Sequence, residues 1–391
     1  MTRSVAEILT NIDLFAEDQR ENLVDALAVA RRECPVLHTG ADGGYYVVSR
    51  YEDVRTVCLH PEVFSSRQPG LRGVPVRLIP IDTDPPDHRA YRRFLNSYFS
   101  RDFLLRYEQD MRKIARDAIA GFAGRGEVEI VGEYSIPFSA GSLAKIVFAT
   151  GNADLVERGV AAVKRVAIEG SPETFQVVAT LAMEALAEVA QAPEGREDVL
   201  YALATEEVDG RALTTEEQLG IITTLLLGGL DTTRGMIVNI AYHLATRRDI
   251  EPILRDPDWW QGSLAEFVRL DPTVSFMART VTQDNDLLGV PLKAGDRLAI
   301  HFYSANRDGR RFDRPDELDF DRPDATSLAF GLGVHRCLGL HFARIQLAIA
   351  FEELLAAATN FRLVKDGDIP RQTGVPLNSP SELHLAFDRR E

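Results

Sequence analysis

Three glycines and one cysteine lie within ten consecutive residues, Phe330-Gly331-Leu332-Gly333-Val334-His335-Arg336-Cys337-Leu338-Gly339. Glycines allow a tight backbone path with positive φ and a close approach to a flat ligand, so this loop can hold the Cys337 sulfur rigidly. The Ala/Leu-rich run that follows predicts a helix beginning just after the cysteine, and its N-terminal amides would stabilise a thiolate. A lone cysteine on a glycine-rich turn is more often structural, so Cys337 alone leaves both interpretations open.

The composition is that of an ordinary globular protein. The chain has 391 residues, of which 45% are hydrophobic and 26% are charged. It contains no repeat and no Pro/Ser/Gly-rich linker at which it would divide, so we expect a single domain spanning residues 1–391. A chain of this length can bury a large core together with a cofactor.

The charge and the N-terminal segment argue against several kinds of partner. A formal net charge of -15 disfavours nucleic acid. Residues 1–24 lack the basic-then-apolar pattern of a signal peptide, and the apolar run at 221–230 is too short to span a bilayer. The three cysteines show no CxxC spacing, which fits a reducing compartment. We therefore expect a cytoplasmic protein without a membrane anchor.

Hydrophobic periodicity predicts a mainly α (α+β) fold with a small β-region near both ends of the chain. Helices are expected at 51–59, at 88–121 with a break near 100–102, over most of 135–205, at 214–246 and at 263–270. Strands are expected at 45–49, 279–282, 286–288, 297–302, 361–364 and 382–387. At a rise of ~1.5 Å per residue the helix at 214–246 would be long enough to cross a large domain.

This long central helix carries Gly228-Gly229-Leu230-Asp231-Thr232 in an otherwise apolar segment. Two adjacent glycines in mid-helix cost about 1 kcal/mol each relative to alanine, and a helix used only for packing would avoid them and the polar pair. Glycine pairs allow a kink and a close approach to the backbone, and threonine hydroxyls can bond into a distorted helix. An ordinary kink near solvent is the simpler alternative.

These two motifs resemble those of the cytochrome P-450 superfamily. The cysteine loop matches the family's pattern Phe-Gly-x-Gly-x-His-x-Cys-x-Gly at every defined position, and residues 228–232 are similar to its acid-alcohol motif. The resemblance implies the cytochrome P-450 fold, with heme b (iron protoporphyrin IX) between the central helix and the cysteine loop. It also implies that Cys337 is the iron ligand and that Asp231 and Thr232 are catalytic residues that guide protons. Arg234, just after this pair, is less usual; it can pair with Asp231 or with another acid and alter proton delivery.

Further motifs occur in the family's order. Glu266, Arg269 and Arg322 match a buried Glu-Arg-Arg network, which in the family supports the cysteine loop. The resemblance implies that four other residues bind the heme propionates, since burying a dianionic edge requires compensating donors. They are His88 and Arg92, at i, i+4 after a pair of prolines, together with Arg279 and His335.

The implied activity is that of a heme-thiolate monooxygenase, which inserts one oxygen atom of dioxygen into a small-to-medium hydrophobic organic molecule by hydroxylation or oxidative dealkylation. No flavin or ferredoxin segment is fused here, so a separate ferredoxin and ferredoxin reductase are implied. The basic stretch from Arg89 to Arg116 is the expected docking surface for an acidic ferredoxin. A heme-thiolate peroxygenase or isomerase and a non-catalytic heme binder are the alternatives, and the Asp231-Thr232 pair disfavours the first two.

By analogy with the family, the substrate pocket is expected to be mainly apolar. Its predicted walls are the loop at 69–80, the region 160–182, Leu226, Leu227 and Leu230 of the central helix, residues 274–277 and a turn near 375–379.

Overall fold

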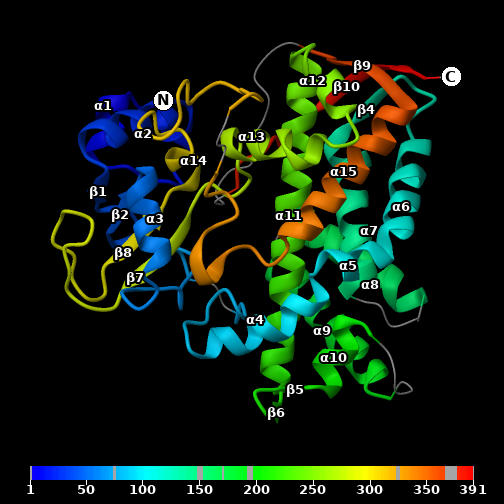
Figure 1. Ribbon diagram of the computed structural model, residues 1–391, viewed down its shortest axis with the longest axis horizontal. Coiled ribbons are helices and arrows are strands. Elements are labelled where there is room, and N and C mark those ends of the chain that lie inside the picture. Colours follow the sequence, from blue (N-terminus) through cyan, green and yellow to red (C-terminus); the bar gives the residue numbers. More distant parts are fainter. Residues whose placement is uncertain are drawn as a thin grey trace.

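The computed structural model describes residues 2–73, 76–147, 153–169, 171–191, 197–322, 326–365 and 377–390. A long helix, α11 (Thr215–Thr246), runs through the middle of the molecule (Figure 1). The N-terminal helices and a β sheet lie on one side of it, and a layer of long helices packs on the other. The mainly α fold with a small β-region is therefore confirmed.

The helices of the described chain are α1 (Val5–Thr10), α2 (Leu23–Glu33), α3 (Tyr51–Leu59), α4 (Asp87–Tyr98), α5 (Arg101–Leu104), α6 (Glu108–Ala120), α7 (Ile136–Val147), α8 (Ala153–Glu169), α9 (Pro172–Val189), α10 (Val199–Thr205), α11, α12 (Ile250–Leu254), α13 (Ser263–Leu270), α14 (Phe302–Ala305) and α15 (Leu340–Ala357). The strands are β1 (Val36–Thr39), β2 (Tyr45–Val48), β3 (Phe64–Ser65), β4 (Glu127–Glu129), β5 (Glu207–Val208), β6 (Arg211–Ala212), β7 (Met277–Val281), β8 (Arg297–Ile300), β9 (Ala358–Leu363) and β10 (His384–Arg389).

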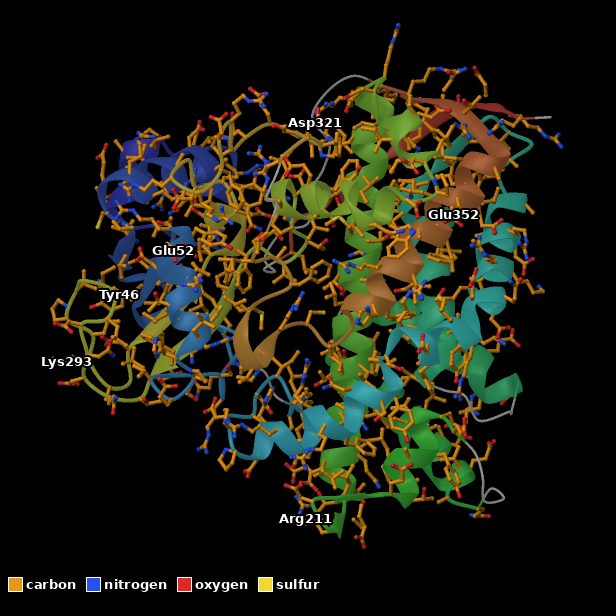
Figure 2. The ribbon with its side chains drawn as sticks, in the orientation of Figure 1. Tyr46, Glu52, Arg211, Lys293, Asp321 and Glu352 are labelled. Carbon is orange, nitrogen blue, oxygen red and sulfur yellow. The ribbon has the colours of Figure 1, made fainter. Side chains whose placement is uncertain are left out.

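The start of α11 is fixed by local chemistry. Thr214 and Glu217 form a capping box, in which each side chain accepts a hydrogen bond from the other's backbone N–H. Arg211, which lies in β6 just before α11 (Figure 2), donates to both Glu217 oxygens at 2.6 and 2.8 Å. The Tyr91 hydroxyl of α4 donates to one of the same oxygens at 2.5 Å. These donors hold the pKa of Glu217 well below its usual range. The cap therefore ties α4, the β5–β6 hairpin and α11 together.

The body of α11 is buried on most sides, as a central helix must be. It contacts α7, α9, α15 and α8, and its apolar side chains form much of the largest core cluster. By length and composition α11 could also cross a membrane, but 67% of its most apolar window is buried inside the protein. Its hydrophobicity is thus accounted for by the core.

In the described chain, a five-stranded sheet has the order β1-β2-β8-β7-β3, with β2 and β8 parallel and the other neighbours antiparallel. A second sheet, β4-β10-β9, joins a segment before α7 to the C-terminal end. The strand predicted at 286–288 is wrong: this segment is a turn closed by a single bridge between Asn285 and Leu292. The strand predicted at 297–302 ends at Ile300, because Phe302 begins α14.

The long segment predicted as a loop at 64–87 is attached to the first sheet. Its first two residues form β3, and the Ala278 N–H donates to the Pro69 carbonyl at 2.8 Å. Arg297 of β8 donates to the Gln68 carbonyl at 3.1 Å and also to the Gly70 carbonyl. The sheet thus fixes the first part of a loop that continues to the start of α4.

Candidate active site

The cysteine loop is held in one conformation by its glycines and by α3. Gly331 and Gly333 have φ values of 66° and 69°, which favour glycine, and a Cβ on Gly333 would lie 2.5 Å from the Cys58 carbonyl oxygen. The Cys337 N–H donates to the Phe330 carbonyl at 2.7 Å. The following helix, α15, begins at Leu340, two residues later than its predicted start. The backbone therefore presents the Cys337 side chain from a closed, rigid turn.

Cys337 is surrounded by protein atoms and yet is accessible to solvent. Burial raises the pKa of its thiol, opposed by a hydrogen bond from the Gly339 N–H and by the charges of Arg92 and Arg336. The side chain nevertheless keeps solvent-accessible surface. A sulfur that lies deep in the protein and borders an opening to solvent has both the raised pKa and the accessible surface. The favourable N–H and guanidinium groups are of the kind that stabilise a thiolate.

The four predicted propionate partners gather around this sulfur. The rings of His88 and His335 lie 4.3 Å apart between centroids, although they come from α4 and the cysteine loop. Burial and Arg92 lower the pKa of His88 to about 4, and burial, Arg279 and His88 lower the pKa of His335 to about 3. Arg92 also acts on Cys337 electrostatically. The structure therefore brings together all five residues predicted to bind the cofactor.

This cluster is rich in donors and poor in acceptors. His88 Nδ1 and His335 Nε2 are buried and have no hydrogen-bond partner among the described residues. Arg279 is 7% exposed, and its guanidinium donates to the Ala278 carbonyl at 2.7 Å, with no carboxylate paired to it in the described chain. Buried donors and cations without anions are costly, so the cluster fits an anionic group next to a thiolate ligand. A heme with two propionates satisfies both requirements.

The glycine pair of α11 has two different environments. A Cβ on Gly228 would meet nothing within 4 Å, whereas a Cβ on Gly229 would lie 2.8 Å from the Leu143 side chain of α7. A Cβ at position 229 would therefore require the Leu143 side chain to shift, whereas Gly228 leaves open space beside the helix backbone. The Thr232 hydroxyl donates to the Gly228 carbonyl at 2.6 Å, four residues earlier. The predicted bonding of this hydroxyl into the helix is confirmed, and α11 continues without a break.

Asp231 forms an ion pair within α11. Arg234 donates to its Oδ1 from Nη2 at 3.0 Å and from Nε at 3.2 Å. Burial raises the pKa of Asp231, and Arg234 opposes that shift. The pairing that the sequence suggested is thus present, and a carboxylate lies next to the Thr232 hydroxyl along the chain.

The predicted Glu-Arg-Arg network is formed and buried. Arg269 is 0% exposed and donates to both Glu266 oxygens at 2.7 and 2.8 Å, while Arg322 Nε lies 3.3 Å from each of them. The remaining Arg269 donors reach the carbonyls of Asn306, Pro315 and Glu317. The Asn306 side chain in turn accepts from the Leu328 N–H at 2.8 Å. The network therefore fixes the chain that leads into the cysteine loop.

The basic stretch is less cationic than its sequence predicts. Five of its side chains pair with acids: Arg93 with Asp209, Arg106 with Glu197, Arg112 with Glu108, Glu352 and Glu353, Lys113 with Asp117, and Arg116 with Glu353. Sequence reasoning missed Arg336 and Arg344, which have no acidic partner in the described chain and act on each other electrostatically. The absence of an acidic residue between Arg336 and Arg344 could have indicated them.

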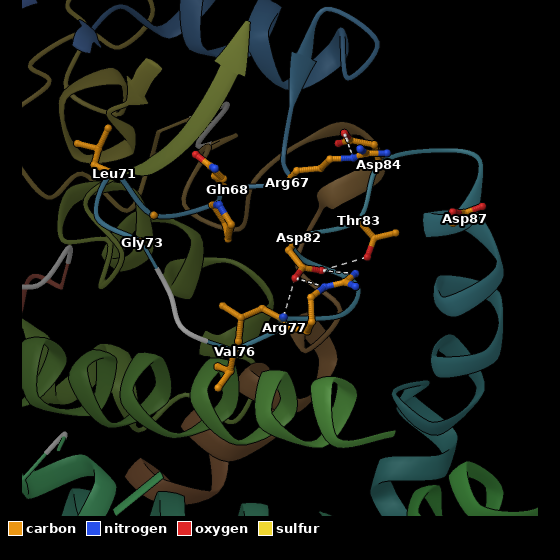
Figure 3. Close-up of a pocket in the computed structure, with 13 residues that line it drawn as sticks. Arg67, Gln68, Leu71, Gly73, Val76, Arg77, Asp82, Thr83, Asp84 and Asp87 are labelled. Carbon is orange, nitrogen blue, oxygen red and sulfur yellow. Dashed lines mark hydrogen bonds and ion pairs between the residues drawn. The ribbon is translucent and has the colours of Figure 1, made fainter. Parts of the chain in front are cut away.

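The loop at 67–87 lines an open pocket of about 630 Å³ (Figure 3). More than half of the residues that line it are polar or charged, and within its wall Arg77 donates to Asp82 at 2.8 Å. This differs from the expected apolar wall, because Val76 is 43% exposed while Ile79 is buried in the core. Of the other predicted walls, Leu226 and Leu230 of α11 are buried. Residues 74–75, 170 and 375–376 of the predicted walls lie outside the described chain.

Comparison with known proteins agrees with this geometry. The family model described as cytochrome P450 matches residues 260–382. Steroid C26-monooxygenase of Mycolicibacterium smegmatis is 26% identical over 357 residues, 88% of each chain. Cytochrome P450 107B1 of Saccharopolyspora erythraea is 28% identical over 392 residues, 94% of each chain. The solved structure of cytochrome P450 CYP109Q5 from Chondromyces apiculatus superposes with a TM-score of 0.86, at 26% identity, over 98% of this chain and 99% of the other.

The fold, the cysteine loop and these relatives define a heme-dependent oxidoreductase of the monooxygenase class. The family-model match, the curated relatives and the solved structures all identify a bacterial-type cytochrome P450.

Proposed function

We propose that Cys337 is the axial ligand of heme b and that His88, Arg92, Arg279 and His335 hold its propionates. The observation that carries this proposal is the cluster of buried donors around an accessible cysteine: in the described chain no carboxylate is hydrogen-bonded to them, and Asp84 acts on His88 and Arg279 only at longer range. The test is the Soret band of the reduced, carbon-monoxide-bound protein. Cys337→Ala abolishes the long-wavelength thiolate position, whereas Cys34→Ala, at an exposed cysteine, retains it. Retention of that position by Cys337→Ala would refute the ligand assignment.

The heme, when bound, supplies dioxygen activation, helped by electron donation from the thiolate. The overall reaction consumes one dioxygen, two electrons and two protons, and it yields one oxygenated product and one water. The chain's own residues bring in the protons: Asp231 takes them from solvent, and the Thr232 hydroxyl passes them toward the oxygen site. The 2.6 Å hydrogen bond to Gly228 holds that hydroxyl at the helix position beside open space.

We propose a hydrophobic small-molecule substrate. The buried leucines of α11, close in sequence to Gly228 and Thr232, support an apolar environment for the substrate. A relative that acts on steroids makes sterols the first compounds to screen. The measurement is the shift of heme spin state on binding. Absence of a spin-state shift with every hydrophobic compound in the screen would contradict the proposal.

We propose that the electrons come from a separate acidic ferredoxin and its reductase, as in other bacterial members. Docking is assigned to Arg336 and Arg344 together with Arg89 and Arg101, which have no acidic partners among the described residues. Arg336 acts directly on Cys337 electrostatically, so a partner bound there would approach the sulfur side of the heme. The whole chain is proposed to work as one domain, in the cytoplasm.

A peroxide-driven reaction is the second candidate, and no observation of the structure favours it. Product formation with ferredoxin, reductase and dioxygen supports the monooxygenase. Product formation with hydrogen peroxide alone, at an equal or higher rate, would favour the peroxygenase.

A further inference from the structure

The ion pair between Asp231 and Arg234 has an unusual position for a charged pair. The side chain of Arg234 is 3% exposed, and that of Asp231 is 23% exposed. A guanidinium buried to this degree in the middle of a core helix costs free energy that a surface pair does not. Removing a carboxylate's partner inside a protein changes its protonation far more than at the surface. A role in the function of the site explains such a pair better than packing alone.

The geometry of the pair is set by one helix. Residues at i, i+3 face the same side, so the contact is maintained by α11 alone and does not depend on movements of α8 or α9. Arg234 makes a further interaction in addition to those with Asp231. Its guanidinium is thus anchored, and it can hold the carboxylate in one orientation.

Most other charges on the elements that pack against α11 are engaged elsewhere. Among the described residues, Arg234 is the charged group that acts on Asp231. Several charged side chains on these elements have their own partners: Lys145 of α7 with Asp110, Arg158 of α8 with Asp154 and with Glu184 of α9, Glu353 of α15 with Arg112, Glu133 with Arg125, Glu251 of α12 with Arg255, and Arg362 of β9 with Asp388. Arg344 of α15 has no acidic partner in the described chain, and it is not among the groups that act on Asp231.

We infer that Arg234 is a positioning residue of the proton relay, which keeps Asp231 ionised and fixed in orientation, so that uptake of a proton from solvent limits delivery to Thr232. The inference rests on the proposed roles of Asp231 and Thr232. Its physical basis is the competition at Asp231, where burial favours the neutral acid and Arg234 favours the carboxylate. Arg234 shifts this balance toward the proton-accepting carboxylate, and its removal shifts the balance toward the protonated acid.

The first test follows the protonation of Asp231 without turnover. The infrared carboxyl band of the ferric holoenzyme is titrated with pH, and the Asp231 contribution is isolated as the difference from Asp231→Asn. In Arg234→Met the titration midpoint of Asp231 rises by about one to three pH units, the effect expected for losing an adjacent guanidinium. Arg234→Lys keeps a positive charge and restores most of the wild-type midpoint. An unchanged midpoint in Arg234→Met overturns the inference.

The second test uses the fraction of electrons that appear in product. Loss of Arg234 moves the alkaline limb of this coupling to higher pH, by the same amount as the carboxyl midpoint, because a proton stays on Asp231 to higher pH. A purely structural role would lower holoprotein yield and leave the pH of the limb unchanged. If Arg234→Met does not accumulate as folded holoprotein, Arg234→Gln and Arg234→Lys provide the comparison.

The two proposals fail in different ways. If Asp231→Asn retains wild-type coupling at every pH, the relay role of Asp231 is wrong. If Asp231→Asn loses coupling while Arg234→Met retains the wild-type midpoint and limb, the relay stands and the role of Arg234 is wrong.

Discussion

Gly333 of the cysteine loop packs directly against the carbonyl oxygen of Cys58 at the end of α3. A Cβ on Gly333 would lie 2.5 Å from that oxygen, a distance that side-chain carbons do not adopt. Gly331, two residues earlier, has a similar positive φ, yet its Cβ would lie 3.4 Å from the nearest atom, the His335 carbonyl oxygen. Gly331 is therefore needed only for its positive φ, whereas Gly333 is needed both for its positive φ and for its close contact with α3.

Gly331→Ala and Gly333→Ala should differ in severity. Both force alanine into the left-handed region, at a cost of roughly 1–2 kcal/mol. Gly333→Ala must in addition push the loop from α3, which adds about 1–3 kcal/mol of overpacking. Denaturant unfolding of the holoenzyme measures the difference, and the thiolate spectrum reports whether the sulfur stays in place. Equal losses in the two variants would show that contact with Cys58 does not constrain the loop.

Thr232→Ala should uncouple electron transfer from product formation. The hydroxyl that donates to the Gly228 carbonyl is lost, while the helix backbone remains, so substrate binding and electron consumption continue. We expect product per electron to fall by roughly 10²-fold, the lower end of the range for a positioned proton donor, with a matching rise in peroxide.

Thr232→Ser is the matched control, since it keeps the hydroxyl. It should recover most of the coupling. If Thr232→Ala retains normal coupling, another group delivers the protons.

The pattern of helices and the site motifs could be predicted from the sequence because their chemistry is local. Residues 51–59 and 263–270 form helices with the predicted bounds, and the Thr214 cap marks the start of α11. The cysteine loop could be recognised because its glycines and cysteine lie within ten residues. These features depend on neighbours in the chain.

What could not be predicted depends on contacts between distant segments. The acids that neutralise Arg112 come from α6 itself and from α15, and only folding brings the latter beside it. The short strand β4 exists because β10 lies next to it. The segment 286–288 pairs with no strand in the described chain, and the single bridge beside it joins Asn285 to Leu292. The close approach of His88 to His335 likewise follows from the packing of α4 against the cysteine loop.

Glu266→Gln should destabilise the protein much more than a matched change at the surface. It leaves Arg269, which is 0% exposed, without its carboxylate. Breaking a buried pair in this way costs about 3–5 kcal/mol. Asp117→Asn breaks a surface ion pair, in which the side chain of Asp117 is 64% exposed and that of Lys113 is 70% exposed. This change should cost about 0–1 kcal/mol. Urea unfolding of the holoenzyme gives both values. A loss below 1 kcal/mol in Glu266→Gln would mean that the network does not brace the loop.

Charge reversal at the proposed docking surface should weaken the binding of ferredoxin and leave the binding of substrate unchanged. Arg336 and Arg344 repel each other, with no acid to neutralise them in the described chain, so an acidic partner gains from covering both. Arg344→Glu should therefore raise the KM for ferredoxin by about tenfold, a change of roughly 1.4 kcal/mol in binding, and flatten its dependence on salt. The affinity for substrate, read from the spin-state shift, should stay the same.

Lys113→Glu is the control, because Lys113 already pairs with Asp117 within the basic stretch. Its effect on the ferredoxin KM should be small if docking takes place beside the cysteine loop. A large effect of Lys113→Glu together with no effect of Arg344→Glu would move the docking site to α6. Arg336 lies close enough to Cys337 to act on the thiol, so Arg336→Glu is expected to change both ferredoxin binding and the reduction potential of the heme. Arg344→Glu is the better test of docking, because Arg344 is not among the groups that act on Cys337.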